Sequence, residues 1–141
     1  MKFQFFTSDS AQTRAAGKVL AAELLKTKSG KKAFVLGLVG DLGSGKTTFL
    51  QGFARGLGLK DKILSPTFII MRRVNNFYHL DCYRIQKPQE MISLGFEKII
   101  TDPKNIIAVE WADLIRKIMP ADTIWVEFEF LSEKKRKIVI R

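Results

Sequence analysis

The 141-residue chain is the size of one domain, too short to carry a nucleotide domain and a separate substrate domain. Its composition, 46% hydrophobic and 27% charged, is typical of a globular protein, and no apolar run reaches the roughly 20 residues that span a bilayer. The single cysteine, Cys82, excludes an intrachain disulfide, and the apolar start is too short for a signal-peptide core. We therefore expect a cytoplasmic protein without membrane association. The net charge of +10 favours polyanionic partners, although a solvated Lys-rich surface explains it equally well.

The first part of the chain predicts two strands, each followed by a helix. Residues 3–7 resemble a short strand, and residues 8–10 supply N-cap candidates for a helix that runs to about residue 26. Residues 33–39 form a continuous apolar run, which is typical of a buried strand in a parallel sheet, and a helix is expected over 46–57. The apolar face of the first helix is expected to hold Ala15, Val19, Ala22 and Leu25.

The middle of the chain predicts a hairpin and then a short helix. The strand-like runs 67–74 and 77–84 flank Asn75-Asn76, a pair that favours a tight turn. Pro88 is expected to open the helix, and Gly95 is expected to end it.

The last part adds a buried strand and a terminal hairpin. Residues 106–111 form a second apolar run, and residues 113–119 are expected to form a short helix. Residues 123–130 and 137–141 are expected to pair as the hairpin. Buried strands alternating with helices indicate an α/β fold with three layers and a mixed sheet.

A glycine-rich motif follows the first apolar run. The stretch from Gly40 to Thr47 satisfies G-x-x-x-x-G-K-[ST] between a predicted strand and a predicted helix, the setting of a phosphate-binding loop. The glycines let backbone N–H groups surround phosphates, and the following helix adds the positive end of its dipole. Lys46 is expected to reach the β- and γ-phosphates, and Thr47 is expected to bind Mg²⁺. We therefore expect a single-domain P-loop NTPase-like fold over residues 1–141 that holds ATP with Gly40, Asp41, Leu42, Gly43, Ser44, Gly45, Lys46, Thr47 and Thr48.

Two acidic residues are candidates for the rest of the site. Glu110 ends the second apolar strand, where parallel strands deliver functional residues, although an acid at a strand end can also simply reach solvent. Strand alternation places His79, Asp81 and Tyr83 on one face, which an exposed edge strand would explain equally well. His79 is the only histidine, and we interpret it as a hydrogen-bonded structural residue in preference to a catalyst.

Four motifs in this order closely resemble the TsaE family, bacterial ATPases of tRNA threonylcarbamoyladenosine synthesis. The resemblance covers nearly the whole chain and also includes Thr7-x₅-Thr13 and Leu94-Gly95 ahead of Glu97. The four motifs are the phosphate loop with Thr48, Ser65-Pro66-Thr67-Phe68, His79-x-Asp81-x-Tyr83-Arg84 and Glu110-Trp111.

The resemblance implies specific roles for residues of this chain. Thr47 and Glu110 would ligate Mg²⁺, while Asp81 would lie near the metal or position the attacking water, so that Lys46, Asp81 and Glu110 form the catalytic set. Residues 65–68 would act as a switch-like segment. Thr13, Trp111 and Arg136 would lie at the nucleotide, and the neighbouring Lys134, Lys135 and Lys137 leave open which basic residue of the last hairpin makes that contact.

The resemblance also implies a partner and a reaction. The family hydrolyses ATP while bound to the TsaD–TsaB heterodimer, which it resets between rounds of modification of the adenosine beside the tRNA anticodon. We accordingly expect a Mg-dependent ATPase that is slow alone and stimulated by its partner, with tRNA contact through the complex left open. Two alternatives are a small P-loop kinase, for which only Arg72-Arg73 could supply an arginine-rich lid, and a nucleotide-gated binding module. A GTPase is disfavoured because no N-K-x-D motif is present.

Overall fold

The computed structural model describes residues 2–27, 30–60 and 71–141. Its contacts divide the chain into two compact units. The first comprises Met1–Lys28, Gly40–Ser65 and Val126–Arg141, and the second comprises Ser29–Val39 and Pro66–Trp125. Among the described residues, no helix is both long enough and apolar enough to cross a membrane.

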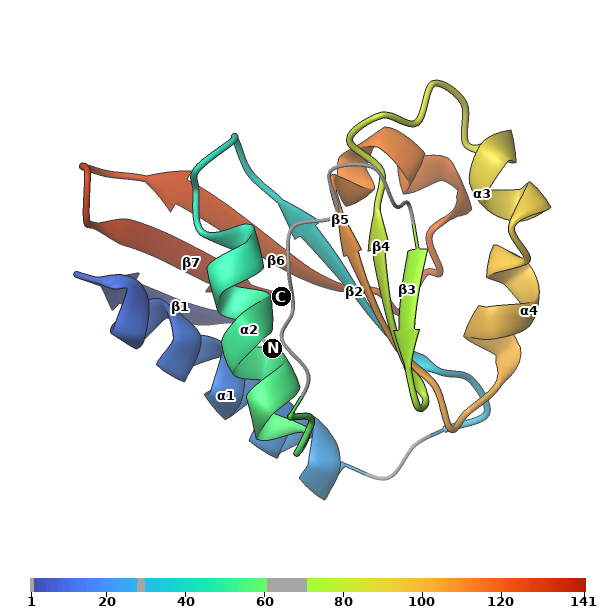
Figure 1. Ribbon diagram of the computed structural model, residues 1–141, viewed down its shortest axis with the longest axis horizontal. Helices are drawn as coiled ribbons and strands as arrows, with labels where there is room; N and C mark the ends of the chain where they lie inside the picture. The colour runs from blue at the N-terminus through green and yellow to red at the C-terminus, as the bar shows by residue number, and fades with distance from the viewer. Residues whose placement is uncertain (1, 28–29, 61–70) are drawn as a thin grey trace. The chain divides into compact units, whose positions relative to one another are not determined.

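The first unit combines an antiparallel sheet with two long helices (Figure 1). The central strand β7 (Arg136–Ile140) pairs with β1 (Phe3–Thr7) and with β6 (Ile124–Phe130), which belongs to this unit from Val126 onward. The helices are α1 (Ser10–Lys26) and α2 (Lys46–Gly56). Helix α2 packs on the sheet through the ring of Phe49, which meets Phe128 edge-on at 5.4 Å between centroids.

Helices α1 and α2 pack against each other through glycine. A Cβ atom at Gly17 would lie 2.1 Å from the carbonyl oxygen of Phe49, and one at Gly52 would lie 1.8 Å from that of Arg14. The face of α1 that packs against α2 is therefore not the predicted face. Two residues of the predicted face, Val19 and Leu25, are 48% and 60% exposed. The prediction was wrong because α1 carries two apolar stripes, and only one of them contains the glycine that lets the backbones approach. The buried residues of α1 are Thr13, Ala16, Gly17, Leu20, Ala21 and Leu24.

The second unit contains a mixed sheet in the order β2-β5-β4-β3 (Figure 1). Strands β2 (Phe34–Val39), β5 (Ile106–Glu110) and β4 (Phe77–Asp81) are parallel, and β3 (Met71–Val74) is antiparallel to β4. The β3–β4 turn contains Asn75 at φ 55°, as the Asn-Asn pair predicted. The remaining elements are α3 (Gln89–Ser93), α4 (Phe96–Thr101) and the 3₁₀ helix η1 (Ala112–Ile118).

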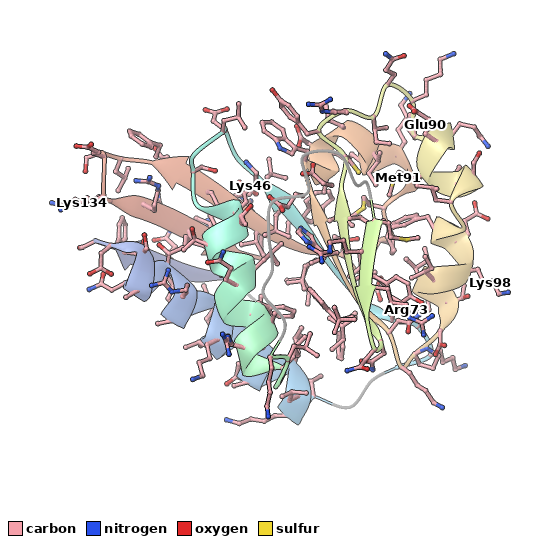
Figure 2. The ribbon with its side chains drawn as sticks, viewed as in Figure 1. Lys46, Arg73, Glu90, Met91, Lys98 and Lys134 are labelled. Carbon is pink, nitrogen blue, oxygen red and sulfur yellow. The ribbon has the colours of Figure 1, made fainter. Side chains whose placement is uncertain are left out.

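One face of this mixed sheet carries the apolar core of the second unit. Tyr78, Leu80, Val109 and their neighbours pack there with residues of α3, α4 and η1. Met91 of α3 is fully buried in this core, whereas Glu90 beside it is exposed (Figure 2). The polar residues His79, Asp81 and Glu110 lie on the opposite face of the sheet, because successive side chains of a strand alternate between its two faces.

The α/β class with a mixed sheet is confirmed, and the structure adds one helix and corrects the end of one strand. Helix α4 was not predicted; Gly95, at φ 88°, both follows α3 and precedes α4. Strand β4 ends at Asp81, three residues earlier than predicted. It ends there because the Asp81 carboxylate accepts the backbone N–H of Tyr83 at 2.9 Å and turns the chain. Residues 67–70 of the other predicted strand lie outside the described residues.

Candidate functional site

The phosphate loop begins directly after β2 and ends in the first turn of α2. Gly43 and Gly45 adopt φ values of 76° and 105°, a region that favours glycine. At Gly40, a Cβ atom would lie 2.6 Å from the hydroxyl of Ser44 and 2.9 Å from the carbonyl oxygen of Phe128. At Gly43, by contrast, a Cβ atom would meet no described atom within 4 Å. The loop is therefore tightly curved on its inner side and open at Gly43.

Lys46 lies at the start of α2, and its ammonium group is held by the loop (Figure 2). Its Nζ donates to the carbonyl oxygens of Gly40 and Asp41, the latter at 2.9 Å, and the side chain is only 5% exposed. Among the described residues no side chain caps α2, whose N-cap is Gly45. A buried ammonium group beside the uncapped N-terminus of a helix is a donor set that fits a polyphosphate.

Thr13 supports the phosphate loop from α1. Its hydroxyl group hydrogen bonds with that of Thr7 at 2.8 Å and lies 3.3 Å from the carbonyl oxygen of Asp9. Its methyl group lies 3.5 Å from the position of a Cβ atom at Gly45. The described contacts of Thr13 are thus with the loop and with β1, and its predicted contact with the nucleotide stays a prediction.

Arg136 connects the terminal hairpin to the phosphate loop. Its Nη2 donates to the carbonyl oxygen of Gly43 at 3.0 Å, and its guanidinium group lies 4.5 Å from the ring centre of Phe130. Lys134 of the same hairpin is exposed (Figure 2), and which basic residue of the hairpin contacts the nucleotide stays a prediction. The pattern of charges gave no signal for the contact of Arg136 with Gly43. The Nη1 donates to the carbonyl oxygens of Ser132, Glu133 and Lys135.

The two candidate acids lie in the second unit, on neighbouring parallel strands. Asp81 of β4 and Glu110 of β5 are register partners at the carboxyl ends of their strands. Leu38 of β2 is the register partner of Glu110 on the other side. Glu110 is 3% exposed, so the alternative that it merely reaches solvent is wrong. A carboxylate this deeply buried needs polar partners.

His79 provides one of those polar partners. Its Nε2 lies 2.6 Å from Oε2 of Glu110, and the imidazole is 1% exposed. The interpretation of His79 as a hydrogen-bonded residue is confirmed, whereas the alternative of an exposed edge face is wrong for this residue. The structure adds the identity of the partner, which strand alternation alone could not supply.

Trp111 follows Glu110 in an unusual backbone conformation. It adopts φ 57° and ψ 39°, the left-handed region that non-glycine residues rarely occupy outside special sites. Its ring lies 5.0 Å from that of Tyr83. Tyr83 and Arg84 lie in the turn after β4, so the predicted strand alternation does not extend to them.

The remaining predictions concern the switch-like segment, the metal ligands and the arginine pair Arg72-Arg73. The switch-like segment 65–68 lies outside the described residues. In the described part of the chain, no three His, Cys, Asp or Glu residues gather in a way that could hold a metal ion by themselves. Arg72 and Arg73 lie on strand β3, and Arg73 is bonded to the carbonyl oxygen of Asn75 with its guanidinium group over Tyr78. This placement gives no support to an arginine-rich kinase lid.

Comparison with known proteins identifies a family for this sequence. Residues 7–138 match the family described as "Threonylcarbamoyl adenosine biosynthesis protein TsaE". The chain is 35% identical over 136 residues to the tRNA threonylcarbamoyladenosine biosynthesis protein TsaE of Bacillus subtilis, covering 94% of this chain and 80% of the relative. It is 34% identical to the protein of the same name from Rickettsia felis, covering 92% and 74%. The crystal structure of YdiB from Bacillus subtilis matches with a TM-score of 0.79 and 30% identity, covering 99% of this chain and 84% of that one.

Proposed function

The chain belongs to the TsaE family, and we propose that it hydrolyses ATP as a component of threonylcarbamoyladenosine synthesis in tRNA. The observation that carries the ATP part of this proposal is the phosphate loop. Its glycines curve the backbone, and it holds the Lys46 ammonium group at the N-terminus of α2. Such a loop binds the phosphates of a nucleotide with backbone N–H groups and one lysine.

The proposed roles of the site residues follow from their chemistry. Lys46 binds the β- and γ-phosphates, while the hydroxyl group of Thr47 and the carboxylate of Glu110 hold Mg²⁺. The metal ion, when bound, neutralises charge on the phosphates. Asp81 positions the attacking water or the metal. Two observations support this assignment: Thr47 follows Lys46 in the phosphate-loop motif, and Glu110 ends the buried parallel strand β5.

Partners and location belong to the same proposal. The TsaD–TsaB heterodimer is the proposed partner, with tRNA reached through that complex and the cytoplasm as the place of action. The net charge of +10 supports a role beside a polyanion, because basic proteins attract nucleic acid over long range. A strict kinase would need an acceptor for its phosphoryl group, so phosphate release from ATP in the absence of any acceptor separates the ATPase from it.

Substitution of Lys46 tests the nucleotide site. We expect Lys46→Ala to weaken ATP binding by about ten- to a hundredfold, because a charge-assisted hydrogen bond is worth roughly 1.5–3 kcal/mol. Isothermal titration calorimetry measures the affinity, and Lys98→Ala is the matched control, since it removes the same charge from the exposed surface of α4. Unchanged ATP affinity in Lys46→Ala would contradict the phosphate-loop assignment.

A further inference from the structure

We infer that His79 is a positioning residue, which fixes the carboxylate of Glu110 in the orientation that binds the metal of a metal–nucleotide complex. The inference rests on the proposed function, because it takes Glu110 as a metal ligand. It adds a residue that would act through Glu110 without touching nucleotide or metal. Three features support it: a short hydrogen bond between His79 and Glu110, the burial of both side chains, and the small side chain of Ala108 on the neighbouring strand β5.

The hydrogen bond joins two fully enclosed side chains. The imidazole is 1% exposed and Glu110 is 3% exposed, with 2.6 Å between Nε2 and Oε2. An ionised carboxylate can only accept, so Nε2 must carry the proton that is shared with it. In a buried setting such a bond is strong, and losing one partner leaves the other polar group without its bond. The carboxylate is therefore held at one oxygen by the imidazole.

The sheet leaves room for this contact because of Ala108. The register partner of His79 on β5 is Ala108, and Glu110 lies two residues further along the same face. Ala108 is fully buried and carries only a methyl group. The imidazole can consequently lean along the sheet to a diagonal neighbour, where a larger side chain at Ala108 would occupy the same space.

The second ring nitrogen supports the assignment of the proton. Nδ1 of His79 is buried and has no hydrogen-bond partner among the described residues. A proton on Nδ1 would therefore be an N–H donor without an acceptor in the described part of the chain, which is costly. Placing the proton on Nε2 leaves Nδ1 as an acceptor and gives Glu110 its donor.

Residues that orient a metal ligand tune metal affinity, and the test measures that property directly. Their substitution typically costs about ten- to a hundredfold in metal affinity. The measured quantity is the gain in nucleotide affinity on going from EDTA to excess Mg²⁺, obtained by calorimetry with a non-hydrolysable ATP analogue. For His79→Leu we expect this gain to fall about tenfold or to disappear, with the affinity in EDTA unchanged.

Two further variants separate positioning from structural support. The amide nitrogen of glutamine lies about as far from the backbone as Nε2, so His79→Gln keeps an N–H donor and should retain more of the Mg²⁺ gain than His79→Leu. The double variant His79→Leu/Glu110→Gln should lose no more of the gain than Glu110→Gln alone, since both changes act through one carboxylate. Urea unfolding of each variant shows which ones are folded.

The outcomes distinguish this inference from the proposed function. If Glu110→Gln keeps the full Mg²⁺ gain, Glu110 is not a metal ligand, and the inference is overturned together with that part of the proposed function. If Glu110→Gln loses the gain while folded His79→Leu keeps it, the inference alone is overturned. The inference is also overturned if the double variant loses the sum of what the two single variants lose of the Mg²⁺ gain. It is likewise overturned if His79→Leu weakens nucleotide binding equally in EDTA and in Mg²⁺.

A spectroscopic measurement tests the hydrogen bond without any substitution at His79. His79 is the only histidine, so the protein labelled with ¹⁵N gives a single set of imidazole signals. We expect Nε2 to be protonated and its resonance to shift in Glu110→Gln. An imidazole whose Nε2 carries no proton could not donate to the carboxylate and would overturn the inference even if His79→Leu did not fold.

Discussion

Cys82 illustrates how one buried side chain beside the site is kept chemically inert. It lies directly after Asp81 and is fully buried. Burial, which is the largest cause, and the negative charges of Asp81 and Asp113 together raise the pKa of the Cys82 thiol to about 12. Because thiolate is the nucleophilic form, such a thiol reacts slowly.

Alkylation of Cys82 is a direct test of this environment. At pH 8 a thiol with a pKa near 12 is only about one part in ten thousand thiolate, so we expect iodoacetamide to label the native chain far more slowly than a small thiol. In guanidinium chloride the label should be taken up fully. Rapid labelling under native conditions would contradict the buried position.

The same raised pKa of Cys82 predicts that the free energy of unfolding falls as the pH rises above about 8.5, the pKa of an unfolded thiol, because the unfolded chain then releases the proton first.

The residues of the site differ in how far the sequence could predict them. Lys46 belongs to a local motif, in which spacing alone defines the chemistry, and the structure places it inside a curved loop as such a motif requires. The partner of His79 could not be predicted in the same way. His79 and Glu110 are 31 residues apart in the chain, and their contact depends on the register of β4 and β5 and on the small side chain of Ala108.

At the scale of elements, the packing of α1 on α2 depends on glycine where sequence patterns favour larger apolar residues. Gly17 and Gly52 let the two backbones approach so closely that a Cβ atom at either position would overlap a carbonyl oxygen of the other helix. Helix α2 carries Lys46 in its first turn, so this contact also supports the phosphate loop. The spacing of apolar residues gives no indication of a contact made through glycine, and the predicted face of α1 was wrong for this reason.

Gly52→Ala is expected to destabilise the chain despite improving helix propensity. Alanine favours a helix over glycine by about 1 kcal/mol, yet the added methyl group would lie 1.8 Å from the carbonyl oxygen of Arg14. Because that oxygen is backbone, the helices must move apart, and overpacking of this kind costs about 1–3 kcal/mol. Urea unfolding measures the change. Gly30→Ala, where a Cβ atom meets no described atom within 4 Å, is the control and should shift stability by less than about 0.5 kcal/mol. Equal behaviour of the two variants would exclude close packing at Gly52.

The elements themselves were largely predictable, and the misses have local physical causes. The strands and the two long helices follow clear apolar runs, and they are found within a few residues of their predicted bounds. Helix α4 was missed because Gly95 was interpreted as the end of one helix, while it also starts the next. Strand β4 ends early because the carboxylate of Asp81 accepts a hydrogen bond from the backbone N–H of Tyr83 and turns the chain.

At the scale of the whole molecule, Lys46 and Arg136 are cations of the first unit that contact the phosphate loop. Phosphoryl transfer is accelerated mainly by positioning and by charge placed on the transferring group. In the described part of the first unit, Arg136 donates to carbonyl oxygens of the hairpin and of Gly43 through both terminal nitrogens. Arg136 is thereby engaged in holding the loop. The cation that the phosphate loop itself supplies is Lys46.

This arrangement predicts slow hydrolysis by the isolated chain and marked stimulation by its partner. An arginine supplied by a partner can accelerate such reactions by about 10³–10⁵, and the TsaD–TsaB heterodimer is the proposed source of such an arginine. Single-turnover hydrolysis with and without the heterodimer measures the effect. Asp81→Ala should keep much of its ATP affinity and lose the stimulated rate, because Asp81 is assigned to positioning and not to phosphate binding. Asp122→Ala removes an exposed carboxylate of the same unit and should behave like the wild type. A fast rate that is indifferent to the heterodimer would exclude partner stimulation and favour an enzyme that works alone.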